Sequence, residues 1–97
     1  LYTDTAVLTA KKVESSTTET ISALITNYID ILVSEKTLTI SDMVDGSKIQ
    51  FRNSSTGDAN LNFDMIIGSN RISAPSVMPS GDSYELFYDV SELAWVM

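Results

Sequence analysis

Apolar and polar residues alternate with a period of two in the middle of the chain. In TLTIS (37–41) and in KIQFR (48–52), every second residue is apolar. This alternation places the apolar side chains on one face of a β-strand and the polar side chains on the other. The pair Asp45-Gly46 lies between the two stretches and tolerates the positive φ angles of a tight turn. Residues 37–52 are therefore predicted to form a β-hairpin with one apolar and one polar face.

The chain after this hairpin has the same pattern of strands and turns. Residues 53–58 form a polar loop by composition, and Pro75 makes 72–79 irregular because proline cannot donate to a sheet ladder. The run 84–90 is nearly continuous in apolar and aromatic residues, which is typical of a strand buried on both faces or at a subunit interface. Further strands are predicted at 60–64, 84–90 and 93–97, the last two forming a second hairpin.

The stretch 17–33 is compatible with two local structures. Ile21, Leu24 and Ile25 fall on one face of a helix, but Ile21 and Ile25 also fit the alternation of a strand. β-branched residues dominate 28–33 and favour a strand there. Residues 17–27 remain open between a helix and a strand.

The first part of the chain has no convincing period. Residues 1–16 mix polar and small apolar residues, and two lysines interrupt any apolar stripe. We expect an N-terminal arm or connector there, extended or partly helical. Residues 17–97 are predicted to form a single, mainly β domain, since 97 residues supply one small core.

Composition excludes several classes of partner and site. The net charge is −7, which disfavours binding to nucleic acid phosphates and to anionic membranes. No apolar run approaches the ~20 residues of a membrane-spanning helix. The chain has neither histidine nor cysteine, so zinc sites, thiolate nucleophiles and histidine-activated serines are excluded.

Carboxylates are the remaining candidates for catalysis. Most of the aspartates stand beside glycine or serine, where turns recruit aspartate for its hydrogen bonds to the backbone. No segment has the ligand spacing of a calcium loop. We therefore expect no enzyme, no metal site and no cofactor. The aspartates considered are Asp42, Asp45, Asp58, Asp64, Asp82 and Asp89.

Aromatic residues gather near the C-terminus. Such residues fill cores, line subunit interfaces or form ligand platforms. The residues named here as a candidate subunit interface are Tyr84, Leu86, Phe87, Tyr88 and Trp95.

The order of several short motifs resembles a known group of proteins. YIDILV (28–33) is followed by TLTI (37–40), GSKIQFRN (46–53) and GDSYELFYD (81–89), and the chain closes with Trp95-Val96. This order is similar to that of the small β domains of tailed-bacteriophage virion proteins, especially distal tail-fibre domains and trimeric attachment or decoration proteins.

The resemblance implies a fold and a role. The expected fold is a compact antiparallel β-sandwich, jelly-roll-like, assembled as a homotrimer on the virion surface or tail. The expected role is structural and non-enzymatic, through contacts with other virion proteins and with a host surface glycan as a candidate partner. The alternative is a stand-alone carbohydrate-binding β-sandwich module, which would expose aromatic side chains on one flat face.

Overall fold

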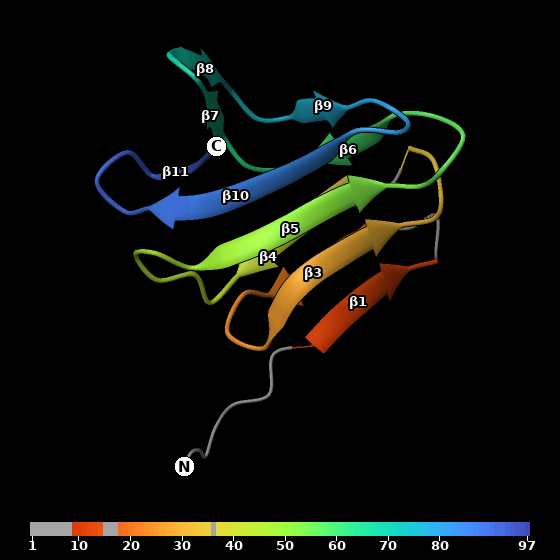
Figure 1. Cartoon of the computed structure of the whole chain (residues 1–97), viewed down its shortest axis with the longest axis horizontal. Helices are drawn as coiled ribbons and strands as arrows, with labels where there is room; N and C mark the ends of the chain where they lie inside the picture. The colour runs from red at the N-terminus through yellow and green to blue at the C-terminus, as the bar shows by residue number, and fades with distance from the viewer. Residues whose placement is uncertain (1–8, 15–17, 36) are drawn as a thin grey trace.

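Every element of secondary structure that the computed structural model describes is a β-strand. The described residues are 9–14, 18–35 and 37–97, and none of them lies in a helix. The strands form two sheets, with four long strands of one sheet side by side in the foreground of Figure 1. The prediction of a mainly β fold is confirmed.

The larger sheet, called sheet A here, has seven strands in the order β1-β3-β5-β10-β11-β7-β8. Its strands are β1 (Thr9–Val13), β3 (Thr26–Ile31), β5 (Lys48–Asn53), β7 (Met65–Ile67), β8 (Asn70–Ile72), β10 (Ser83–Asp89) and β11 (Ala94–Val96).

The smaller sheet, called sheet B, has four strands in the order β2-β4-β6-β9. Its strands are β2 (Glu19–Ser22), β4 (Thr37–Ser41), β6 (Ala59–Leu61) and β9 (Ser76–Met78).

The first six strands alternate between the two sheets. β1, β3 and β5 are parallel neighbours in sheet A, and β2, β4 and β6 are parallel neighbours in sheet B. The chain therefore winds as a coil through three passes of each sheet. After this coil, β9 pairs antiparallel with β6 and β10 pairs antiparallel with β5, whereas β11 pairs in parallel with β7.

Two predictions about strand pairing are wrong. The predicted hairpin 37–52 does not form, because β4 lies in sheet B and β5 lies in sheet A. Six residues, 42–47, connect these strands, a length that can cross the ~10 Å between packed sheets. The sheets are also mixed, so the expectation of an antiparallel sandwich is replaced by an all-β fold with parallel and antiparallel pairs. Gly46 does adopt the predicted positive φ, at 87°, in the crossing turn.

Other predicted elements agree with the structure. The strand at 28–33 corresponds to β3, and the second hairpin is present as the antiparallel pair β10 and β11. The open stretch 17–27 contains β2 and a turn into β3. Part of the predicted arm 1–16 lies outside the described residues, and its residues 9–13 form β1 within sheet A.

The long strand β10 is buried on one face only. Leu86 and Tyr88 point into the core, whereas Glu85 and Phe87, which alternate with them, are exposed. Burial on both faces, one of the two explanations for the apolar run 84–90, is therefore wrong.

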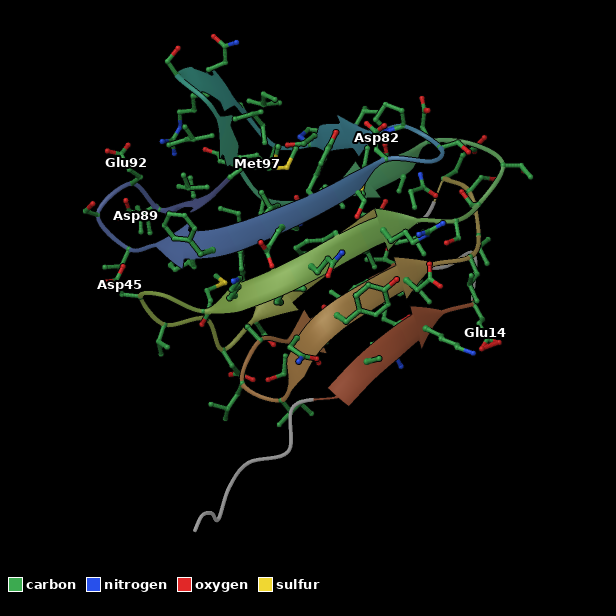
Figure 2. All side chains as sticks on the ribbon, viewed as in Figure 1. Glu14, Asp45, Asp82, Asp89, Glu92 and Met97 are labelled. Carbon is green, nitrogen blue, oxygen red and sulfur yellow. The ribbon has the colours of Figure 1, made fainter. Side chains whose placement is uncertain are left out.

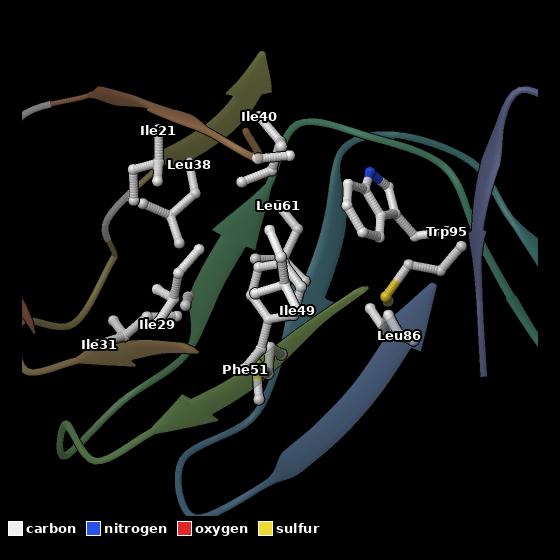
Figure 3. Packing of buried hydrophobic residues seen from close by; sticks show 14 of the residues in the cluster. Ile21, Ile29, Ile31, Leu38, Ile40, Ile49, Phe51, Leu61, Leu86 and Trp95 are labelled. Atoms are coloured by element: carbon white, nitrogen blue, oxygen red, sulfur yellow. The ribbon is translucent and has the colours of Figure 1, made fainter. Parts of the chain in front are cut away.

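The core lies between the sheets and changes in character along the stack of strands. Aliphatic residues from both sheets meet at the β1 and β2 end, and Trp95 packs at the other end near Leu86 (Figure 3). The ring centroids of Phe51 and Trp95 are 6.1 Å apart in an edge-on arrangement, and those of Tyr88 and Trp95 are 5.4 Å apart. Aromatic pairs of this geometry add to the stabilisation from apolar burial.

A buried amide joins the two sheets where β5 ends. The Asn53 side chain is fully buried, and its amide donates to the carbonyls of Gly57 and Met78 at 2.9 and 2.8 Å. Its oxygen accepts from the Ser55 backbone N–H at 3.0 Å and the Ser55 hydroxyl at 2.6 Å. One side chain therefore holds the 53–58 loop and strand β9 together.

Replacing Asn53 by alanine is expected to destabilise the fold by about 2–4 kcal/mol, because several buried backbone groups would lose their partner. Asn62→Ala is the matched control, since the Asn62 amide makes an exposed hydrogen bond to Thr39 at 3.2 Å. Urea unfolding measures both variants. Equal losses of unfolding free energy in N53A and N62A would contradict this role of Asn53.

Candidate functional site

The aspartates considered as catalytic candidates stabilise turns. The Ser22 hydroxyl donates to Asp42 at 2.6 Å, and the Val90 backbone N–H donates to Asp45 at 3.1 Å. Asp89 accepts from both the backbone and the hydroxyl of Ser91, which lowers the pKa of its carboxyl. The bonds to Asp89 fix a local turn, whereas the bonds to Asp42 and Asp45 join segments 20 and 45 residues apart in the sequence.

The acidic side chains do not converge on a cleft. In Figure 2, Asp45, Asp89 and Glu92 lie at one end of sheet A, whereas Asp82 and Glu14 lie at the other end. Within the described ranges, no group of three or more His, Cys, Asp or Glu side chains could hold a metal ion.

One ion-pair network clamps the loops around β7 and β8. Arg71 contacts Asp64 at 3.0 Å and the Glu92 carboxylate at 3.4 Å, and it donates to the Glu92 carbonyl at 2.9 Å. Asp64 also accepts from the Ala74 backbone N–H at 2.8 Å. That bond and the nearby guanidinium lower the pKa of the Asp64 carboxyl. The network ties the loops that carry Asp64 and Glu92 to strand β8, which carries Arg71.

The five residues of the candidate interface are placed differently. Leu86, Tyr88 and Trp95 are buried in the chain's own core. Tyr84 is half-buried against that core, and its hydroxyl donates to Asp82 at 3.0 Å; burial and the adjacent carboxylate raise the pKa of Tyr84. Phe87 points away from the core and is 45% exposed. Phe87 is thus the member of the set that presents most of its ring to a partner.

The outer face of sheet A carries a shallow hollow of about 310 Å³. Asn27, Lys48, Gln50 and Glu85 line it, and they come from three adjacent strands, β3, β5 and β10. This face is turned toward the viewer in Figures 1 and 2. The alternation in 48–52 predicted that Lys48 and Gln50 face outward, but the juxtaposition with Asn27 depends on the parallel pairing of β3 with β5.

The other surface feature is the end of the coil formed by β1 and β2. These strands are the outermost strands of sheets A and B, so each presents a backbone edge that no described strand covers. A second hollow, of about 270 Å³, lies between them, with Lys11, Ile21 and Ile25 among its lining.

Comparisons with known proteins bear on the fold alone. No family model matches the chain, and no curated protein matches it. Among solved structures, the chain is similar to one titled "Structure of a chaperone-substrate complex", with 19% sequence identity and a TM-score of 0.50. The match covers 91% of this chain and 16% of that chain, so the chain spans a small part of its neighbour's length. No helix among the described residues is long and apolar enough to cross a membrane.

The lowered pKa of Asp64 predicts a pH-dependent contribution to stability. Because the folded state holds this pKa below the ordinary 3.8, the contribution is present above that value and is lost as pH falls through the folded pKa. We expect Asp64→Asn to be less stable than the unmodified chain at pH 6, with the difference shrinking as pH falls below about 4.

Urea midpoints measured between pH 6 and pH 2 test this expectation. Asp58→Asn, at an exposed position, is the control and should change little. A difference between D64N and the unmodified chain that stays constant down to pH 2 would refute it.

Proposed function

We propose that this chain is a non-enzymatic structural domain of a phage virion, a tail-fibre or attachment subunit or a capsid decoration subunit. It acts through protein–protein contacts. The order of motifs from YIDILV (28–33) to Trp95-Val96 supports the virion assignment. The use of aspartates in turns supports a role without catalysis.

The observation that carries a role in protein–protein contacts is the end of the coil at β1 and β2. Strand edges that no described strand covers can offer backbone N–H and C=O groups to an added strand. The turn between β2 and β3 adds apolar surface beside these edges, since Leu24 and Ile25 are 62% and 55% exposed. An end with both features is suited to contact another polypeptide.

The assembly that we propose is a homotrimer on the virion surface or tail. A domain of 97 residues without disulfides gains stability when subunits bury additional apolar surface. A net charge of −7 keeps such a protein soluble where many copies are crowded together. Other virion proteins are the remaining partners in this proposal.

Light scattering of the purified chain over a range of concentrations tests the assembly, and we expect the mass of a trimer. The double variant Leu24→Ser, Ile25→Ser should lower that mass toward the monomer, because it removes apolar surface at the contacting end. Val44→Ser is the matched control, since Val44 is also 62% exposed but lies in the loop between β4 and β5.

A monomer at every concentration would count against the trimer. A trimer that persists in the double variant, or that V44S disrupts equally, would move the contact away from the β1 and β2 end.

A further inference from the structure

We propose that the hollow on the outer face of sheet A binds a neutral saccharide. The proposal stands on the arrangement of β3, β5 and β10, and it does not depend on the subunit contact proposed at the β1 and β2 end. It assigns a specific surface, with named lining residues, to a carbohydrate ligand on a domain proposed to act through protein contacts.

Strand register assembles the site from distant parts of the chain. Tyr28, Gln50 and Glu85 are partners across the three strands, and Lys48 is the partner of Phe87 in the neighbouring row. Paired residues in a sheet share a face. Gln50 faces outward because Ile49 and Phe51 on either side of it are fully buried.

A β-bulge contributes the fourth lining residue. The register of β1 against β3 passes from Thr9 with Thr26 to Ala10 with Tyr28, which leaves Asn27 without a partner. Bulges redirect a side chain and occur often beside functional sites. Asn27 lines the hollow together with residues of the outer face.

The chemistry of the lining favours a neutral polyhydroxylated ligand over an ion. Lys48 and Glu85 lie 3.4 Å apart and offset each other's charge. The carboxamides of Asn27 and Gln50 each supply donors and acceptors. Neighbouring hydroxyls, which donate and accept in the same way, match such a lining.

Two aromatic rings flank the polar hollow. Tyr28 is half-exposed on β3, and Phe87 is 45% exposed on β10. Their strands are separated only by β5, and Phe87 lies one row further along than Tyr28, so their Cα atoms stand about 12 Å apart. Ring faces of this kind pack against the apolar C–H faces of pyranose rings. Polar residues between two rings therefore fit one or two sugar units.

The outer face of sheet B lacks this combination. The described residues that point outward there carry hydroxyl, amide or aliphatic side chains, with no aromatic ring among them. They are Thr20, Ser22, Thr37, Thr39, Ser41, Asn60 and Val77. The outer face of sheet A is thus the candidate binding surface, and the outer face of sheet B serves as a control surface in the same molecule.

Amide chemical shifts of the ¹⁵N-labelled full chain test the proposal, with maltotriose and triacetylchitotriose as neutral probes. At least one probe should produce saturable shifts centred on 27–28, 48–50 and 85–87. Sorbitol, an acyclic polyol without a pyranose face, and the anionic sialyllactose should not. Shifts from sorbitol equal to those from both sugars, or sialyllactose binding more tightly than either, would overturn the assignment of ligand class.

Variants locate the binding. Gln50→Ala and Phe87→Ala should each weaken it about tenfold or more, which corresponds to about 1.4 kcal/mol. Val77→Ala on the outer face of sheet B should bind as the unmodified chain does. Gln50→Glu keeps the size of the side chain, and its spectrum serves as the check that substitution at this position preserves the fold.

Absence of saturable shifts with both neutral sugars, or unchanged affinity in folded Q50A and F87A, would overturn the proposal. Because the assembly is tested by mass and through Leu24 and Ile25, a failure of one proposal is distinguishable from a failure of the other.

Discussion

The structure depends on one apolar layer shared by two sheets that the chain crosses in turn. Each pass adds inward-facing residues above those of the pass before, so that Ile29 pairs with Phe51 in sheet A and Leu38 with Leu61 in sheet B. Neither sheet can bury its inner face alone, because the other sheet supplies the opposing surface. Strand order, the crossing loops and the outward direction of the remaining side chains follow from this arrangement.

Alternation in the sequence was enough to predict which residues of β4 and β5 face the core, but not which strands pair. Two strands of a hairpin and two strands in different sheets can have the same alternation of apolar and polar residues. A period of two shows which side chains share a face of the strand, but it does not show which strand lies beside it. The coil also has no regular repeat to reveal it: Ile21 pairs with Ile40 and Leu38 with Leu61, spacings of 19 and 23 residues. Register between such distant segments becomes visible only in three dimensions.

The polar contacts of the fold could not be predicted from the sequence for a related reason. In the sequence, Asn53 looks like the first residue of a polar loop, yet it is fully buried. Its side chain donates to the carbonyls of Gly57 and Met78, and Met78 belongs to a segment distant in the sequence. The candidate site on sheet A likewise unites residues of β3, β5 and β10. In contrast, the contact of Asp89 with Ser91 is local and belongs to the turn chemistry that the sequence suggests. The contacts of Asp42 with Ser22 and of Asp45 with Val90 join segments that are distant in the sequence.

The fold depends most directly on the parallel pairing of successive passes. Backbone NOEs in solution can measure this pairing. We predict contacts between 28–31 and 50–53 and between 37–38 and 60–61, with none joining 37–41 to 48–53. Antiparallel Hα–Hα contacts between 37–41 and 48–53 would establish the hairpin instead and contradict the coil. The proposed binding site on β3, β5 and β10 would then also be wrong, because it depends on the parallel pairing of β3 with β5.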